Sequence, residues 1–160
     1  MFAISATFEV NPAGTTVEIS RDAMWQGLVS KAEYAVPFVP AMEDCRIIER
    51  FEDGFIREIK LRGTVMRERI VFTPDVEVYF ERIEPADGGW ITNVMSESKS
   101  GLLLTFTFAL TFPGVAAGSA EEKARGEEVK QSYIVAIQAT IDETRRRVEK
   151  GEITARKGAA

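Results

Sequence analysis

The sequence predicts an α+β fold: a curved, seven-stranded antiparallel sheet wraps around a long C-terminal helix, with two short helices after the first strand. Residues 2–10 alternate between apolar and polar side chains, six further strand-like segments follow, and one long amphipathic helix comes last. The apolar face of that helix must be buried, and the sheet is the only large partner available. With 160 residues, 45% of them hydrophobic, we expect a single domain over residues 1–153 and a frayed tail over 154–160.

The N-terminal third predicts one strand and a helical region. After the strand at residues 2–10, Asn11-Pro12-Ala13-Gly14 is typical of a turn. Ser20 is a good N-cap for a helix that runs to about Ala32. The apolar segment 34–42 contains two prolines, each of which restricts the residue before it. We expect it to form at most a second short helix or a lid.

The middle of the chain predicts a meander of hairpins. Turn residues such as Asp53-Gly54, Arg62-Gly63-Thr64 and Asp87-Gly88-Gly89 separate apolar runs. The expected strands are about 45–51, 54–62, 65–73, 76–82, 89–97 and 102–112. A loop of small residues, 113–118, leads from the last strand to the C-terminal helix.

The C-terminal helix is the most strongly patterned segment. Ser119 and Glu122 form a capping-box sequence, in which each side chain satisfies a free amide of the first turn. Gly151 offers a stop, so about thirty residues at 1.5 Å each give a helix of about 45 Å. The stripe that should face the sheet comprises Val129, Tyr133, Ala136, Ile137, Thr140, Ile141 and Val148.

Composition excludes several classes of protein and site. A net charge of −5 argues against nucleic-acid binding, and the absence of an apolar run of eighteen residues argues against a membrane span. The N-terminus lacks the charged and apolar regions of a signal peptide, and the lone Cys45 fits a reducing compartment, so we expect a cytoplasmic protein. The absence of histidine excludes His-based triads and the usual zinc hydrolase sites. No glycine-rich phosphate loop or metal-ligand spacing is present, and we expect neither a cofactor nor a metal.

Two charged residues are expected on the buried face of the sheet. A two-residue turn at Gly63-Thr64 would place Arg57 and Glu68 among apolar neighbours, as diagonal partners on adjacent strands. Buried charges should be paired, because an unpaired one costs several kcal/mol. The pair could be structural, could orient a ligand on the cavity floor, or could include an acid kept neutral by burial for proton transfer.

Other residues could complete a cavity. The face of Asn93 cannot be decided from the pattern; if it points inward, it needs a partner such as Glu68 or a ligand carbonyl. Tyr133 lies on the apolar stripe of the long helix, where a tyrosine is more often core than catalytic. The candidate cavity residues are Arg57, Glu68, Asn93, Tyr133, Phe106, Phe108, Ile59 and Ile70.

The element order is that of the helix-grip fold of START-type lipid-transfer domains and the major birch-pollen allergen. Five segments in the right order resemble the AtaL-like family of bacterial and fungal proteins within the START/SRPBCC superfamily, and the likeness extends to about Gly151. The segments are 25–32, Phe38-Val39-Pro40, 54–59, 68–72 and 102–108. This resemblance implies a helix-grip fold and a hydrophobic cavity. It implies no agreed activity and no catalytic residues, although some fungal members lie in secondary-metabolite gene clusters.

These observations favour binding of a small hydrophobic, aromatic or lipid-like molecule between the sheet and the C-terminal helix. An alternative is a cyclase, dehydratase or isomerase acting on a polyketide-like substrate, with Glu68 as general acid or base and Arg57 stabilising an oxyanion. A third is a protein-interaction module that uses apolar surface in residues 36–42. The sequence leaves open the identity of the ligand, its turnover and the oligomeric state.

Overall fold

The structure is a computed structural model, and it describes residues 1–85 and 88–154. Residues 155–160, which make up most of the expected tail, lie outside the described residues. The elements, in chain order, are β1 (Phe2–Glu9), α1 (Arg21–Glu33), β2 (Met42–Phe51), β3 (Gly54–Leu61), β4 (Thr64–Thr73), β5 (Glu77–Glu84), β6 (Gly89–Ser98), β7 (Gly101–Leu110) and α2 (Ala120–Glu149). Neither helix within these ranges is long and apolar enough to cross a membrane.

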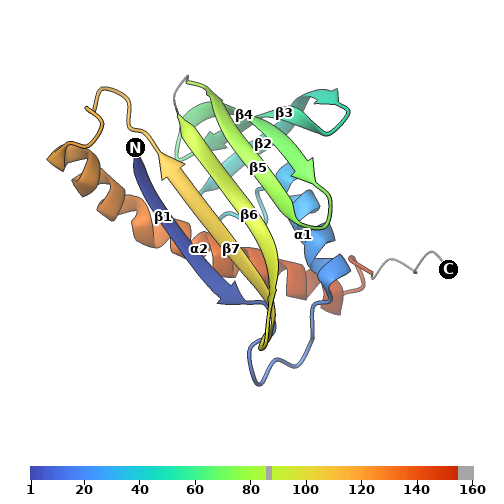
Figure 1. Ribbon diagram of the computed structural model, residues 1–160. Coiled ribbons are helices and arrows are strands. Elements are labelled where there is room, and N and C mark those ends of the chain that lie inside the picture. The colour runs from blue at the N-terminus through green and yellow to red at the C-terminus, as the bar shows by residue number, and fades with distance from the viewer. Residues whose placement is uncertain (86–87, 155–160) are drawn as a thin grey trace.

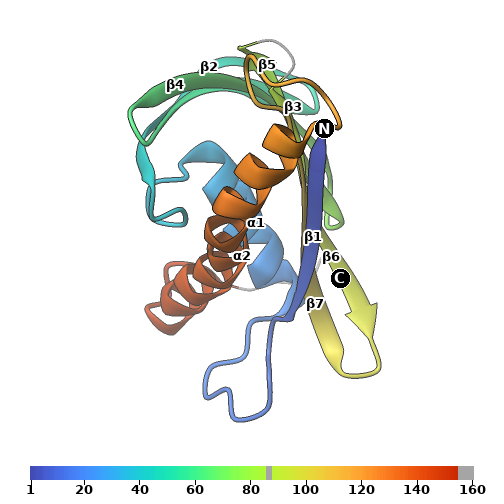
Figure 2. The ribbon, with the colours of Figure 1, turned by 90° about the vertical axis from the view of Figure 1, so that its left-hand side faces the viewer.

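The strands form one antiparallel seven-stranded sheet in the order β1-β7-β6-β5-β4-β3-β2. Figure 1 shows α2 running across the sheet, and Figure 2 shows the sheet curving around α1 and α2, which lie on its concave side. The predicted α+β, helix-grip class is confirmed. Every strand from β2 to β6 pairs with the next one along the chain, and β1 pairs with β7 at the other edge of the order.

One part of the predicted order is wrong, because α1 is the only helix between β1 and β2 in the described chain. Residues 35–41 form hydrogen-bonded turns instead, in which the Phe38 amide donates to the Ala35 carbonyl at 2.9 Å and the Met42 amide to the Val39 carbonyl at 2.9 Å. The prolines at 37 and 40 have no N–H to donate, which prevents a regular helix here. Ala35 and Phe38 are nevertheless fully buried, so the segment is packed against the domain.

The start of α2 follows the predicted capping box in one of its two bonds. The Ser119 hydroxyl accepts from the Glu122 amide at 3.1 Å. The Glu122 carboxylate, however, accepts from the Gly118 amide at 2.9 Å and from the N-terminal ammonium of Met1 at 2.6 Å, not from Ser119. At the other end, Gly151 adopts a φ of 70°, a left-handed conformation that glycine takes without steric cost.

Helix α2 packs unevenly along its length. Its C-terminal half buries Ile137 and Ile141 and approaches α1 closely, since a Cβ at Gly27 would lie 2.3 Å from Thr144 Oγ1. In the N-terminal half, the buried residues are Glu122 and Gly126, at the first turns. The middle of the helix, around residues 128–136, is less covered by the sheet, and the hollow described below lies there.

Candidate ligand-binding site

The β3–β4 hairpin has a different turn from the predicted one. The turn residues are Arg62 and Gly63, both with positive φ (48° and 78°), so Leu61 pairs with Thr64 and Arg57 lies directly opposite Glu68. The predicted turn at Gly63-Thr64 is wrong by one residue, because a β-branched threonine fits a positive φ poorly. The error does not change which side chains face inward. Moving the turn by one residue shifts the pairing of the two strands by two residues, and side chains alternate between the faces of a sheet with that same period.

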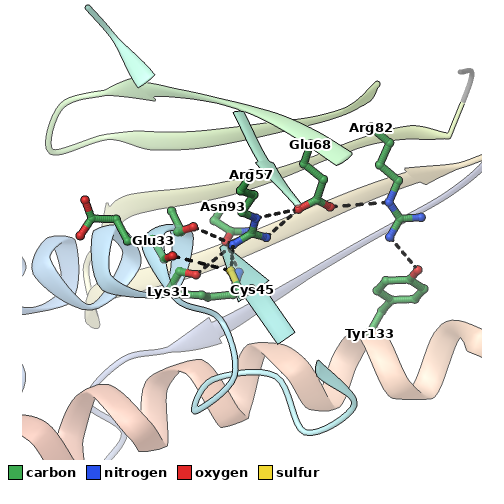
Figure 3. Close-up of polar contacts among 9 residues, drawn as sticks. Lys31, Glu33, Cys45, Arg57, Glu68, Arg82, Asn93 and Tyr133 are labelled. Carbon is green, nitrogen blue, oxygen red and sulfur yellow. Dashed lines mark hydrogen bonds and ion pairs between the residues drawn. The ribbon is translucent and has the colours of Figure 1, made fainter. Parts of the chain in front are cut away.

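Arg57 and Glu68 form a buried ion pair on the inner face of the sheet, 4% and 1% exposed. Arg57 donates to Glu68 Oε2 from Nη2 at 2.6 Å and from Nε at 2.9 Å. Its Nη1 donates to the carbonyls of Lys31 at 3.1 Å and Ala32 at 2.7 Å, in the last turn of α1 (Figure 3). The pair therefore joins the middle of the sheet to the C-terminal end of α1, where a cation is favoured.

Lys31 is a component of the site that we did not predict. Its side chain is 6% exposed, and Nζ donates to Asn93 Oδ1 at 2.6 Å. The ammonium lies 4.9 Å from the ring centre of Phe80 and 4.6 Å from that of Phe106. The pKa of Lys31 is lowered from 10.5 to about 7; burial is the largest cause, and repulsion from Arg57 is the second.

Arg82 is the second component that we did not predict. It lies opposite Glu68 in the β4–β5 pairing, and its Nε is 3.8 Å from Glu68 Oε1, longer than a hydrogen bond. Its Nη2 donates to the Tyr133 hydroxyl on α2 at 3.4 Å (Figure 3). Arg82 Nε is buried and has no hydrogen-bond partner in the described part of the chain. Burial acts to lower the pKa of Arg82, but Tyr133 and Glu68 outweigh it and raise the pKa.

Asn93 points inward and is fully buried, in register with Phe106. The sequence suggests two partners for an inward Asn93, Glu68 and a ligand carbonyl; the structure shows a third, because Asn93 Oδ1 accepts from Lys31. Its Nδ2 is a second buried donor that lacks a hydrogen-bond partner within residues 1–85 and 88–154. Unsatisfied buried donors are rare in folded proteins, so Arg82 Nε and Asn93 Nδ2 each lack an acceptor that a buried donor usually has.

The electrostatics of the site favour an ionised Glu68. Burial raises its pKa, but Arg57, Arg82 and Lys31 outweigh that effect, and the pKa of Glu68 is lowered overall. The alternative in which burial keeps this acid neutral is therefore not supported. The guanidiniums of Arg57 and Arg82 flank one buried carboxylate, so the interior of the sheet has a surplus of positive charge even when Lys31 is neutral.

Two adjoining hollows lie beside this cluster. The inner one is small, about 60 Å³, and the outer one, between the middle of α2 and residues 39–41 and 61–66, is about 690 Å³. Both are lined by Leu61, Arg82, Tyr133 and Ala136. A third hollow of about 480 Å³, toward the loop after β7, is also lined by Arg82. Arg82 thus borders all three.

Most of the predicted cavity residues lie at the inner hollow. Six of the eight line it, namely Arg57, Ile59, Glu68, Phe106, Phe108 and Tyr133. Ile70 is fully buried in the core instead, and Asn93 reaches the hollow only through its bond to Lys31, which does line it. The described residues contain no cluster of cysteine and carboxylate side chains that could hold a metal ion.

Comparisons with known proteins agree with the fold. A model of the family described as acetylaranotin biosynthesis cluster protein L, AtaL, matches residues 4–151. No curated protein matches the sequence significantly.

Solved structures share the architecture at low sequence identity. The Zhui aromatase/cyclase from Streptomyces sp. R1128 aligns with a TM-score of 0.67 at 19% identity, over 96% of this chain and 99% of that one. The di-domain ARO/CYC StfQ of the steffimycin biosynthetic pathway aligns with a TM-score of 0.65 at 11% identity, over 94% of this chain and 52% of StfQ, so the chain spans about half of that protein. Bacillus halodurans protein BH1534 aligns with a TM-score of 0.62 at 14% identity, over 90% and 97% of the two chains. These likenesses establish a shared fold.

Proposed function

The chain belongs to the AtaL family, and we propose that it binds a small hydrophobic or aromatic molecule with an anionic or hydrogen-bond-accepting end, in the hollow between α2 and the sheet. The outer hollow, at about 690 Å³, is within the usual size range of small-molecule sites. Its walls include Val39, Leu61, Val129 and Ala136, which suit an apolar body.

The observation that carries this proposal is the state of Arg82. Its side chain borders both the outer and the inner hollow, and its buried Nε makes no hydrogen bond in the described structure. Leaving a buried donor unpaired costs about 1–3 kcal/mol, more for a charged group. A ligand carboxylate, phenolate or carbonyl between Arg82 and Tyr133 would remove that cost and offset the surplus of positive charge.

A dye-displacement experiment tests the proposal. An apolar fluorescent dye should bind the native protein stoichiometrically and be displaced by naphthoic acid better than by its neutral amide. An Arg82→Gln variant should bind the acid about tenfold or more weakly, because hydrogen bonds to charged groups contribute about 1.5–3 kcal/mol. The matched control is Arg67→Gln, whose side chain is on the exposed face of the sheet.

Two results would contradict the proposal. One is native protein that binds no apolar dye. The other is Arg82→Gln protein that binds naphthoic acid and its amide as the wild type does. Mass spectrometry of small molecules extracted from the purified protein gives an independent measurement, in which a co-purifying organic acid or phenol supports the assignment.

The enzymatic alternative, a cyclase, dehydratase or isomerase acting on a polyketide-like substrate, is favoured by one contact. The Tyr133 hydroxyl accepts a hydrogen bond from Arg82 at the edge of both hollows, where a phenol can donate to a developing oxyanion. The lowered pKa of Glu68 makes it a weaker candidate for the general acid than Tyr133. On this alternative, Tyr133→Phe protein should still bind the dye and fail to convert the substrate.

The interaction-module alternative has little support. Of the apolar side chains in the segment it would use, Phe38 is fully buried and Met42 is 8% exposed. Val36 and Val39 are partly buried against the small cluster formed by Ala35, Met42, Cys45 and Ile59. This leaves too little apolar surface to argue for a docked partner.

A further inference from the structure

We propose that Lys31 is a covalent capture site, whose side-chain amine forms an imine with an aldehyde or ketone carbonyl of a molecule held in the inner hollow. This inference rests on the proposed function, because the carbonyl compound must first enter the hollow between α2 and the sheet. It adds a reactive residue and a chemical class of ligand to that function.

The position of the amine is the first argument. Lys31 lines the inner hollow together with the aromatic rings of Phe80 and Phe106, and its side chain is 6% exposed. The inner hollow shares Arg82 and Tyr133 with the outer one, so a ligand body in the outer hollow can direct a carbonyl inward. At about 60 Å³, the inner space suits the carbonyl end of a molecule and not its body.

The partners of the amine are the second argument. A lysine held only as a structural cation is usually paired with a carboxylate, as Lys60 is with Glu43 at 2.9 Å. Within the described residues, Lys31 makes no ion pair within 4 Å and donates one hydrogen bond, to the neutral side chain of Asn93. That bond holds Nζ in place and leaves its other positions available for a reactant.

The electrostatic surroundings are consistent with a nucleophile. Burial and the nearby guanidinium of Arg57 lower the pKa of Lys31 to about 7, so much of it is a neutral amine near neutral pH. A desolvated lysine beside another cation is a recognised way to activate an amine for imine formation. By contrast, the side-chain hydrogen bond to Glu43 raises the pKa of Lys60 and keeps it protonated.

The chemistry balances without any further reagent. The lone pair of the neutral Nζ attacks the carbonyl carbon and forms a C–N bond while the C=O π electrons move to oxygen. A proton passes from nitrogen to that oxygen, which gives a carbinolamine. The carbinolamine then loses its hydroxyl group and the remaining N–H proton as water, and a C=N bond forms. Tyr133 lines the same hollow and can donate a hydrogen bond to the departing oxygen.

Reductive trapping tests the proposal on the full chain. Native protein is incubated near neutral pH with naphthaldehyde and cyanoborohydride, and the modified lysines are mapped by peptide mass spectrometry. Reduction of the imine leaves an adduct with the mass of the aldehyde less one oxygen atom. We expect Lys31 to be modified at least about tenfold faster than Lys60, because a lysine of ordinary pKa has on the order of one neutral amine in a few thousand near pH 7.

Variants and a protection measurement make the result specific. Lys31→Arg keeps the positive charge and a donor for Asn93 but cannot form an imine, so it should bind the dye and lose the fast modification. Lys60→Met is the matched control and should leave the fast modification unchanged. If the Lys31 variant does not fold, wild-type protein preloaded with the dye replaces it, and modification should slow at Lys31 and not at Lys60.

The outcomes separate this proposal from the proposed function. If naphthaldehyde displaces the dye but Lys31 reacts no faster than Lys60, covalent capture is refuted and ligand binding stands. If the dye neither binds nor protects Lys31, both proposals fail. If Lys31 reacts quickly but the dye that occupies the hollow does not protect it, the reaction does not take place in the hollow, and the capture site is refuted.

Discussion

Removing either member of the Arg57–Glu68 pair should destabilise the fold, and Arg57 should be the more costly loss. Breaking a buried ion pair by removing one partner costs about 3–5 kcal/mol. Arg57→Met also leaves the carbonyls of Lys31 and Ala32 without the donor that now caps the end of α1, at about 1–3 kcal/mol for each unsatisfied group. Against a total stability of about 5–15 kcal/mol, Arg57→Met protein should be marginally folded.

The cost of Glu68→Leu should fall at the lower end of the range of about 3–5 kcal/mol for breaking a buried ion pair. The attraction of Glu68 raises the pKa of Lys31, and the value of about 7 already includes this effect, so loss of the carboxylate lowers the pKa further and lets Lys31 release its proton. Lys31 can therefore lose its charge by releasing a proton to the solvent, whereas the guanidiniums of Arg57 and Arg82 stay charged. The double variant removes both charges but still lacks the cap on α1, so its recovery should be incomplete.

Urea denaturation followed by circular dichroism measures the free energy of unfolding of the wild type, the two single variants and the double variant, which together form a double-mutant cycle. The comparison holds when the dependence of this free energy on urea has the same slope in all four proteins. We expect a coupling energy of about 2 kcal/mol or more, since contacting residues in one network couple by about 0.5–3 kcal/mol. The exposed helix pair Glu121–Arg125, at 2.8 Å, is the matched control and should couple by less than about 0.5 kcal/mol. Single variants that are near neutral and additive would show that the pair is exposed, and the β3–β4 register and the site built on it would fall.

Two further predictions concern the C-terminal helix and the pH dependence of stability. A fragment of residues 1–118 should be insoluble or unfolded, because it exposes Phe106, Phe108 and Leu110, each worth about 1.5–3 kcal/mol when buried; cooperative melting of a soluble fragment would make α2 a separate appendage. The folded pKa of Lys31, about 7, lies below the unfolded value of 10.5, so the unfolded chain binds more protons between these values and the Lys31 contribution to stability rises with pH across that window. The melting temperature of wild type relative to Lys31→Met should therefore increase from pH 7 toward pH 10, and parallel curves would mean that Lys31 titrates normally.

The fold and the Arg57–Glu68 pair were predictable because both depend on local periodicity. Alternation places every second residue of a strand on one face, and this parity survives a turn that is misplaced by one residue. Serine N-caps at 20 and 119 fixed the helix starts, and both accept the expected amide hydrogen bonds. The prediction of a second short helix was wrong because two prolines in a short apolar run remove the amide donors that a regular helix needs, and the run packs as turns.

Lys31 and Arg82 were missed although each continues an apolar pattern. Lys31 follows Met24 and Leu28 at helical spacing, and Arg82 follows Phe80 at strand spacing, so each lies on the inward face of its element. Both stand near the end of an element, where a long charged side chain usually reaches solvent. Whether such a side chain reaches solvent depends on the elements that pack over that end. Here they are β6, whose Asn93 binds Lys31, and α2, whose Tyr133 binds Arg82, and both are distant in sequence.

The two oxygens of Glu68 divide the structural and the ligand-directed parts of the site. Oε2 accepts both Arg57 hydrogen bonds, which are enough to fix α1 against the sheet. Oε1 faces Arg82 at 3.8 Å, close enough for attraction but too far to satisfy its Nε. A purely structural pair needs no second guanidinium, and burying one without a full partner costs stability. An acceptor brought by a ligand would compensate that cost at Arg82, beside both hollows, and this is why we assign the head group of the ligand to Arg82 and not to the better-paired Arg57.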